Sequence, residues 1–575
     1  MKWRLLCGKS FNPALQRRWA STIIPLPRSF AFQRLATFAR ATSVKDQNQQ
    51  LSLKKAIVTQ NGKEFSYMQL LVDSYRLSRR MQDVLSLKSH VFPRQNIQKI
   101  TSLTLSPKTR LNQSRIAVLS KGYNFAVSQM ATHQISGIFV PLSLSNPASE
   151  HVYTIQDSGA SLILVDKSLA HLVSPEMRDG VEVYYMDEIE ARRVDDLGLL
   201  DEYVVKFSET CLSSTPATLV YTSGTTSRPK GVIHTHTSLA AQMQSMMDGW
   251  KWSERDYVLN VLPLHHVHGL VNVLGTSLAA GACCEMCDRM DVKAVWERWV
   301  KSLETGRSGD LGHITLFMAV PTIYVKLLAH YHDSPPEIQV KYRDACKQFR
   351  LMVSGSAALP TRVWNEWQSA TGHRLLERYG MTEIGMALTN PLKESLRVPG
   401  MVGFPFPNVL TRVDVETGEL GVKGPQVFKG YWKLPDKTAE CFDEKGWFKT
   451  GDIVSTDRHG RFTVLGRAST DIIKVSGYKV GAVEIERVIG EVGWVTDVSV
   501  MGIEDLVKGE AVAALVVVDE KKLGSVELDV VQTLKTHCKT HLPHYKVPSV
   551  WKVTKELPRN IMGKVDKKKC KAMIV

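Results

Sequence analysis

A run of hydroxyl-bearing residues between positions 220 and 231 is the strongest chemical signal in the chain. It reads V-Y-T-S-G-T-T-S-R-P-K-G, after an apolar segment (217–221) typical of a buried strand and before a segment (231–247) of helix-like composition. Hydroxyls and backbone N–H groups in such a loop can surround phosphate oxygens, and a lysine adds positive charge. The Gly-Lys-Ser/Thr order of a Walker loop is absent from this run, and the alternative is a surface turn. The predicted phosphate-binding residues are Thr222, Ser223, Gly224, Thr225, Thr226 and Lys230.

A second signature, E-R-Y-G-M-T-E, occupies residues 377–383. The ring of Tyr379 can stack on a purine, and the hydroxyl of Thr382 can bond a phosphate oxygen. The carboxylate of Glu383 can hold Mg²⁺ beside a triphosphate. The motif is weak alone, but its position after the first loop predicts a nucleotide site.

Two further segments follow in the same order. G-W-F-K-T-G-D ends at Asp452, whose carboxylate suits the hydroxyls of a ribose, and Gly466-Arg467 comes next. The chain closes with P-R-N-I-M-G-K-V-D, in which Lys564, taken alone, would be one more solvated cation of a lysine-rich tail.

Composition narrows the function classes. The 575 residues are 43% hydrophobic and 23% charged, which indicates a globular protein of two or more domains. No stretch is long and apolar enough for a transmembrane span. The net charge of +16 would suit a nucleic-acid binder. However, nine of these positive charges lie in residues 1–45, and the remainder carries only +7, so nucleic acid is not an expected partner.

The first 45 residues contain no acidic residue and are rich in arginine and hydroxyl groups. This composition is typical of a mitochondrial transit peptide and predicts a location in the mitochondrial matrix. A disordered basic tail is the alternative.

Histidines and cysteines could suggest a metal. His265, His266 and His268 lack the spacing of a zinc protease, and Cys283, Cys284 and Cys287 lack a second pair. We interpret the cysteines as small buried residues and thiols.

The elements that must position these residues alternate along the chain. Strands are expected at 115–119, 138–141 and 161–165, with helices at 126–137 and 148–158 between them. This order predicts an α/β fold with a parallel, doubly wound sheet. Another strand is expected from 350, ending in a small-residue turn at V-S-G-S-A-A-L-P. After about residue 468, a strand (511–518) and a helix (526–541) indicate a second domain.

In their order, these signatures resemble those of the adenylate-forming superfamily, over roughly residues 55–570. The phrases L-P-L-H-H-V-H-G, V-S-G-S-A-A-L-P and E-R-Y-G-M-T-E look closest to malonyl-CoA synthetases. The chain departs from the superfamily pattern at Ser227, where glycine is usual. The resemblance implies a transit peptide (1–45), a large AMP-binding domain (46–467) of doubly wound mixed sheets, and a smaller, mobile α+β domain (468–575).

The resemblance also implies a two-step reaction. A carboxylate attacks the α-phosphate of ATP with Mg²⁺ present, and the thiol of coenzyme A then displaces AMP. Lys564 and Arg467 would serve the adenylation step. The small domain would then rotate near Ser469 to present Lys474 and Gly477 to coenzyme A.

The substrate hint is Arg378, because the residue before the Tyr-Gly pair faces the acyl pocket in related enzymes. A desolvated cation there favours an anion, so malonate or methylmalonate is predicted, with His266, Met352 and Ser354 also lining the pocket. An ion pair between Arg378 and Glu377 or another acid is the structural alternative.

Other functions stay open. They are a ligase for short- or medium-chain monocarboxylates and a nucleotide-binding protein without catalysis. The sequence does not give the oligomeric state.

Overall fold

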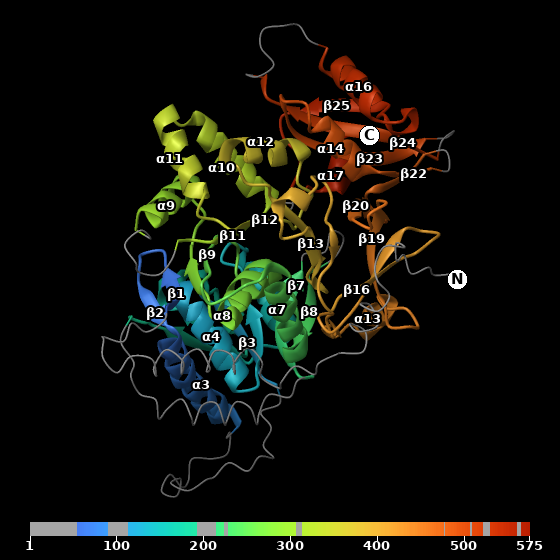
Figure 1. The fold of residues 1–575 in the computed structure, drawn as a ribbon. Helices are drawn as coiled ribbons and strands as arrows, with labels where there is room; N and C mark the ends of the chain where they lie inside the picture. The colour runs from blue at the N-terminus through green and yellow to red at the C-terminus, as the bar shows by residue number, and fades with distance from the viewer. Residues whose placement is uncertain are drawn as a thin grey trace, which may run out of the picture.

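The computed structural model describes residues 55–89, 113–191, 214–222, 228–305, 313–475, 478–505, 509–520, 529–559 and 565–574. Within these ranges the strands form four sheets. Residues 1–54, with the expected transit peptide, lie outside them, as do Ser223–Thr226, Ser227, Gly477 and Lys564. Figure 1 shows the C-terminal elements stacked on one end of the larger part of the molecule.

The first sheet carries the phosphate-loop segment. Its strands run in the order β18-β8-β7-β4-β3-β5-β6, and the central pairs are parallel. The bounds are β18 Gly430–Tyr431, β8 Lys230–Thr235, β7 Pro216–Thr222, β4 Ile138–Pro141, β3 Arg115–Leu119, β5 Leu162–Asp166 and β6 Glu182–Met186.

The second sheet carries the Glu-Arg-Tyr-Gly signature. Its order is β15-β14-β13-β12-β11-β9-β10-β1-β2, parallel from β1 to β13 through the centre and antiparallel at both edges. The bounds are β15 Phe404–Pro405, β14 Gly385–Thr389, β13 Leu376–Met381, β12 Leu351–Ser354, β11 Leu316–Ala319, β9 Tyr257–Asn260, β10 Cys283–Met286, β1 Lys55–Thr59 and β2 Glu64–Ser66.

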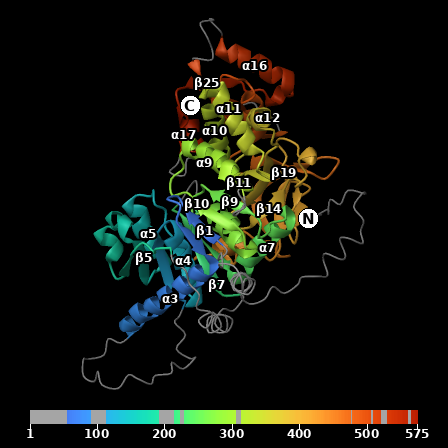
Figure 2. The ribbon, with the colours of Figure 1, turned by 60° about the vertical axis from the view of Figure 1, so that its left-hand side comes forward.

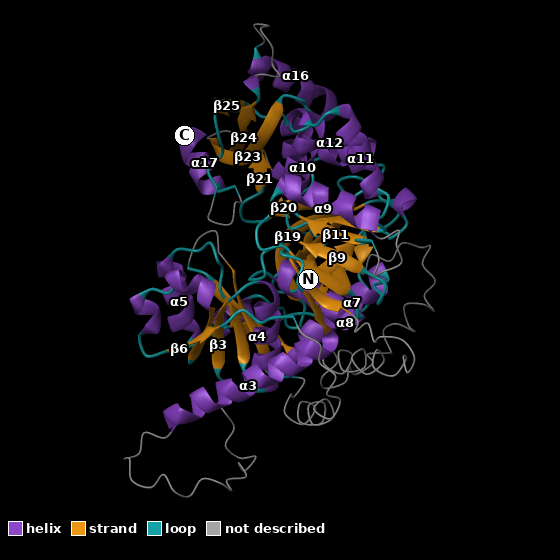
Figure 3. Cartoon of the chain, turned by 90° about the vertical axis from the view of Figure 1, so that its left-hand side faces the viewer, coloured by secondary structure: helices purple, strands orange, loops and turns teal. Residues whose placement is uncertain are grey.

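Helices cover these two sheets, which lie next to each other in Figures 2 and 3. They are α3 Tyr67–Ser89, α4 Gly122–Gln134, α5 Ala148–Ser158, α7 His236–Trp250, the π-helix η3 His268–Gly275, α8 Thr276–Ala280, α9 Val292–Thr305, α10 Pro321–Asp333, α11 Pro336–Cys346 and α12 Thr361–Thr371. Parallel strands connected by helices confirm the predicted α/β fold with mixed sheets.

The prediction of a helix at 231–247 is wrong for residues 231–235. Residues 230–235 form β8, which pairs antiparallel with β7 on one side and with β18 on the other. The helix α7 begins at His236, behind a capping box in which Thr235 accepts from the backbone N–H of Ser238. The phosphate-loop segment therefore joins two strands, and no helix N-terminus follows it directly.

A four-stranded antiparallel sheet, β16-β17-β19-β20, follows in the chain. Its bounds are β16 Leu410–Val413, β17 Glu419–Lys423, β19 Phe448–Thr456 and β20 Phe462–Arg467, and α13 (Pro435–Glu440) lies between β17 and β19 in the sequence. The short helices are η1 Lys167–Leu172, η2 Pro175–Arg178, η5 Glu394–Leu396 and η6 His544–Lys546.

The C-terminal part has a sheet and core of its own. β22, β21, β24 and β23 lie side by side, and β25 adds to β24 in parallel. The bounds are β21 Ile472–Val475, β22 Tyr478–Gly481, α14 Ala482–Ile489, β23 Val495–Asp505, β24 Gly509–Val518, α16 Val530–His541, β25 Val550–Thr554 and α17 Lys567–Ile574. Its buried cluster, with Ile485, Val500 and Leu534, is separate from those of the large part, as expected for a second domain.

Cys283 and Cys284 are buried in β10, Cys287 is half-buried, and all three are free thiols. Among the described residues, no helix is both long and apolar enough to cross a membrane.

Candidate active site

The two ends of the phosphate-loop segment lie opposite each other on the paired strands β7 and β8. Thr222 and Lys230 face each other across β7 and β8, and the Thr222 hydroxyl lies 3.4 Å from the Lys230 carbonyl. The ammonium of Lys230 lies 4.4 Å from the ring centre of Tyr431 on β18. Loop residues 223–227 fall outside the described ranges, so their phosphate-binding role stays a prediction.

Tyr431 also connects this segment to the second signature. Its hydroxyl donates to Oε1 of buried Glu383 at 2.7 Å. Nε2 of His234 on β8 donates to the Thr382 carbonyl at 2.8 Å, and burial lowers the pKa of His234 to about 4, so the ring is neutral. Lys230, Thr382 and Glu383 thus gather in one place, although they come from different sheets.

Glu383 fits a role in holding Mg²⁺. One of its oxygens accepts from Tyr431, and the carboxylate has capacity for a further partner. It belongs to no cluster of three metal-ligating side chains among the described residues. A lone carboxylate is what Mg²⁺ requires when triphosphate oxygens and water supply the other ligands.

The predicted ribose site is built on a pair of neighbouring strands. Asp452 on β19 and Arg467 on β20 are cross-strand partners, with 3.0 Å between Arg467 Nε and Asp452 Oδ1. The hydroxyl of Tyr379 donates to Asp452 Oδ2, which fixes the position of the aromatic ring. Each carboxylate oxygen retains capacity for a further hydrogen bond, so the group can still accept from ribose.

Arg378 is a buried cation without a carboxylate partner among the described residues. It lies on β13 and is 5% exposed. One guanidinium nitrogen donates to Nδ1 of His268 at 2.9 Å and to the Ser356 hydroxyl at 3.1 Å, while Nε has no partner. Burial lowers the pKa of Arg378 to about 9. Other arginines in the large domain are paired, such as Arg350 with Asp256 and Arg298 with Glu285.

The ion pair with Glu377, the structural alternative for Arg378, is not formed. Adjacent residues of a strand face opposite sides, and Glu377 accepts instead from the Gly400 N–H at 2.6 Å. The positive charge of Arg487, on helix α14 of the small domain, favours the ionised form of the Glu377 carboxyl and opposes the rise in its pKa.

Two residues beside Arg378 were missed by the sequence prediction. His268 and Ser356 both hydrogen-bond the guanidinium, and the Ser356 hydroxyl lies 3.2 Å from Nδ1 of His268. Because His268 Nδ1 accepts from Arg378, Nε2 carries the proton, and it has no partner. The three-histidine run was considered as a metal site, and of its members only His266 was predicted to line the acyl pocket; among the described residues these histidines form no metal-ligating group.

The loop from Ser354 to Ser356 lies against the same guanidinium. A Cβ at Gly355 would lie 2.4 Å from Arg378 Nε, so a side chain there would displace the arginine. The Ser354 hydroxyl is buried and unpartnered. Orphaned polar atoms of Arg378, His268 and Ser354 are expected where a polar ligand completes the site. Met352 lies in the hydrophobic cluster with Trp299 and Phe317, and His266 is half-buried with its ring 4.0 Å from that of His265.

The residues predicted to bind coenzyme A belong to the small domain. Lys474 is exposed on β21, and its backbone N–H donates to Glu510 at 2.7 Å. Ser469, the expected hinge, lies in the turn between β20 and β21. Beyond this turn, Asp471 accepts from the Arg467 N–H at 2.9 Å and pairs with Lys567 of α17 at 2.7 Å.

Glu377 gives a pH prediction. Burial raises its pKa from 4.5 to about 7. Above pH 4.5 the unfolded chain releases this proton while the folded protein retains it, so stability falls as pH rises from about 4.5 to about 7. The shift corresponds to about 3 kcal/mol at roughly 1.4 kcal/mol per pKa unit. Glu377→Gln keeps an acceptor for the Gly400 N–H but has no proton to lose. The stability of this variant relative to the wild type should therefore rise by about this amount as the pH is raised from 5 to 8.

Denaturant unfolding at both pH values measures this difference. Glu440→Gln, which changes an exposed carboxylate paired only with Lys437, should show no such gain. An equal stability difference at pH 5 and pH 8 for Glu377→Gln would show that this carboxyl does not titrate in the window.

Comparisons with known proteins show the family of this chain. Residues 112–432 match the family described as AMP-binding enzyme, and residues 484–564 match the AMP-binding enzyme C-terminal domain. The chain is 40% identical over 500 residues to the mitochondrial malonate–CoA ligase of Mus musculus, covering 80% of this chain and 81% of that protein. It is 37% identical over 548 residues to the malonate–CoA ligase of Arabidopsis thaliana, covering 90% and 86%.

A solved structure has the same fold. ATP-bound MatB from Rhodopseudomonas palustris superimposes with a TM-score of 0.72 at 28% identity, covering 94% of this chain and 98% of that one.

Proposed function

Because this chain belongs to the family of AMP-binding enzymes, we propose that it is an AMP-forming acid–thiol ligase that joins malonate to coenzyme A. The family match and the malonate–CoA ligase relatives support the reaction class. The observation within this chain that supports a dicarboxylate substrate is the buried Arg378. It has no carboxylate partner among the described residues. A dicarboxylate offers one carboxylate for chemistry and a second for this guanidinium.

In the first half-reaction, one carboxylate oxygen of malonate attacks the α-phosphorus of ATP, and the bond to the bridging oxygen of pyrophosphate breaks. The products are malonyl-adenylate and pyrophosphate. Tyr379, Asp452 and Arg467 hold the nucleoside end, Lys230 and Thr382 hold the phosphates, and Glu383 would hold Mg²⁺ beside them. Mg²⁺ at Glu383 would supply charge neutralisation. Catalysis then rests on positioning and electrostatic stabilisation.

In the second half-reaction, the sulfur of coenzyme A attacks the acyl carbon of malonyl-adenylate. The thioester bond forms, the acyl–oxygen bond breaks, and AMP leaves. We assign Lys564 to the first step, and Lys474 and Gly477 to the second, after the small domain rotates about the turn that contains Ser469. The proposed domains are 1–45, 46–467 and 468–575.

Arg378 precedes Tyr379 on β13, and we place the acyl pocket at its guanidinium, where the orphaned polar atoms lie. His268, Ser354 and Ser356 line the same place, with His266 proposed beside them. The distal carboxylate of malonate would take the free Nε–H of Arg378 and the Nε2–H of His268. Methylmalonate adds one methyl group to the same two charges and is proposed as a second substrate.

A carboxylate panel tests the function. Malonate, methylmalonate, propionate, butyrate and octanoate are each assayed with ATP, Mg²⁺ and coenzyme A, and AMP and thioester are quantified. The highest kcat/KM should belong to a dicarboxylate. A higher value for butyrate or octanoate would replace the proposal with a short- or medium-chain ligase. The absence of pyrophosphate release with every acid would instead indicate a binding protein.

We propose a mitochondrial location on the basis of residues 1–45, which carry nine basic and no acidic residues. The expected result is that the mature protein, isolated from mitochondria, lacks this segment when its N-terminus is sequenced. A fusion of residues 1–45 to a fluorescent protein should be imported, while a variant with its arginines changed to glutamine should not. Recovery of a mature mitochondrial protein that starts at Met1 would contradict the prediction.

A further inference from the structure

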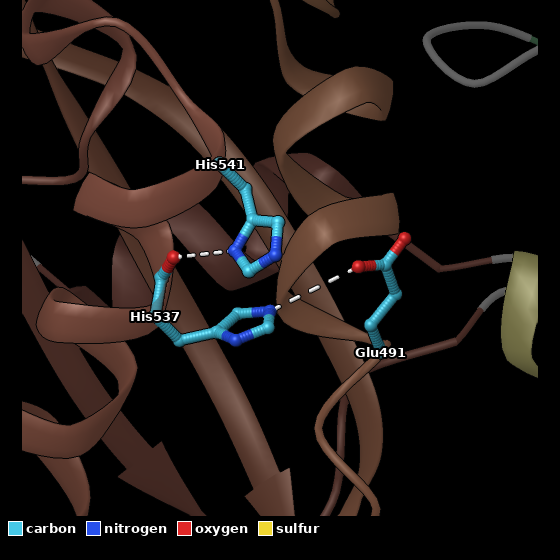
Figure 4. Close-up of side chains that lie close together, drawn as sticks. All are labelled: Glu491, His537 and His541. Atoms are coloured by element: carbon cyan, nitrogen blue, oxygen red, sulfur yellow. Dashed lines mark hydrogen bonds and ion pairs between the residues drawn. The ribbon is translucent and has the colours of Figure 1, made fainter.

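The small domain has a cluster of three metal-ligating side chains outside the active-site signatures. His537 and His541 lie one turn apart on α16, and Glu491 follows the end of α14. The ligand atoms of the three all lie within 4.8 Å of one another. Figure 4 shows the two imidazole rings and the carboxylate turned toward a common space.

We propose that this cluster is a zinc site that connects α14 to α16. Two imidazoles and one carboxylate are a donor set that Zn²⁺ accepts, with water in the fourth position. Imidazole donors also disfavour Mg²⁺ and Ca²⁺, which prefer oxygen ligands. Spacing of four residues on a helix places both histidines on one face.

The hydrogen bonds of the cluster prepare His541 for a metal. Its Nδ1 donates to the His537 carbonyl at 2.9 Å, which leaves Nε2 unprotonated with a lone pair. Metal-binding histidines are commonly oriented by such a bond from the other ring nitrogen. The two rings lie with centres 4.4 Å apart.

His537 can exchange its present bond for a metal. Its Nε2 lies 3.0 Å from the Val488 carbonyl and 4.0 Å from Glu491 Oε2. The Val488 carbonyl also accepts from the Glu491 backbone N–H at 3.2 Å. The carbonyl therefore keeps a partner when the histidine nitrogen loses its proton and turns to the cation.

The helix ends add a favourable electrostatic field. Helix α14 ends at Ile489, two residues before Glu491, and α16 ends at His541. The C-terminal end of a helix carries partial negative charge that stabilises a cation. The cluster thus lies at two such ends, and a bound Zn²⁺ would fasten them together and resist unfolding of the small domain.

Zinc titration of the full-length protein tests the site. Protein stripped with EDTA is titrated with ZnCl₂ against a chromophoric chelator, for the wild type, His541→Ala, His537→Ala and Glu491→Gln. His544→Ala is the matched control, because it removes an exposed histidine of the same domain outside the cluster. The wild type and His544→Ala should bind one equivalent that both cluster histidine variants lack, and Glu491→Gln should weaken it roughly tenfold or more.

Two readouts separate this site from binding by cysteine thiols. Co²⁺ bound to the wild type should show visible d–d absorption, absent in His541→Ala, without a thiolate charge-transfer band. Zn²⁺ should raise the unfolding temperature of the wild type more than that of His541→Ala, which changes an exposed side chain. Equal zinc stoichiometry in the wild type and both histidine variants would overturn the proposal.

Discussion

Lys564→Ala should abolish formation of malonyl-adenylate, while thioester formation from supplied malonyl-adenylate proceeds at close to the wild-type rate. The reason is that Lys564 is assigned to the adenylation conformation alone, in which its ammonium bridges the attacking carboxylate and the α-phosphate. Loss of one preorganised charge donor in a transition state costs on the order of a hundred- to a thousand-fold in kcat. Pyrophosphate release measures the first step, and thioester formation from synthetic adenylate measures the second.

Lys474→Ala should show the reverse pattern, with adenylation retained and thioester formation lost. Lys568→Ala is the control, because it removes an exposed lysine of the same tail; neither half-reaction should change. Arg559 and Val565, the described residues on either side of Lys564, pair in an antiparallel bridge, so truncation of a lysine side chain between them leaves that bridge in place. Equal loss of both half-reactions in both variants would refute the assignment of one lysine to each conformation.

The order of the motifs was enough to predict the family and its fold. Phosphate loop, Glu-Arg-Tyr-Gly signature and Asp452 follow each other in the chain, and each depends on a few neighbouring residues. Local pattern also located α5 at residues 148–158. Its helix ends where Gly159 adopts a left-handed conformation, φ 63°.

The boundary at β8 was not predictable from local pattern. Three of residues 231–235 (Val232, Ile233 and Thr235) are β-branched, but the alanines and methionines from Ala240 onward dominate the composition of the 231–247 segment and hide the boundary. Pairing with β7 and with β18, almost 200 residues away in sequence, decides the strand. Tertiary pairing of this kind overrides intrinsic preference.

The surroundings of Arg378 depended on contacts distant in sequence. Its hydrogen bond to His268 connects residues 110 positions apart. The electrostatic interaction between Arg487 and Glu377 connects residues of two domains. One feature was accessible from the sequence alone. Neighbouring positions of a strand face opposite sides, so an ion pair between Glu377 and Arg378 was geometrically unfavourable once the strand was assigned.

Arg378→Ala should lower kcat/KM for malonate by on the order of a hundred- to several-thousand-fold. Removing one partner of a desolvated ion pair costs roughly 3–5 kcal/mol, at about 1.4 kcal/mol per tenfold. Propionate has no second carboxylate, so its turnover should hold or rise when the buried cation is gone. The measured quantity is the ratio of kcat/KM values, malonate over propionate, in each protein.

Arg397→Ala provides the matched control for that ratio. Arg397 is as buried as Arg378, and burial lowers its pKa to about 10, but its guanidinium donates to the carbonyls of Pro391 and Leu392 at 3.1 and 2.6 Å. Its loss should weaken folding and lower both activities together, leaving the ratio unchanged. The same unchanged ratio in Arg378→Ala would contradict recognition of the distal carboxylate by this arginine and direct the search to His266, His268 and Ser354. A ratio that falls only in Arg378→Ala would assign dicarboxylate selectivity to a buried cation that the protein itself leaves without a carboxylate.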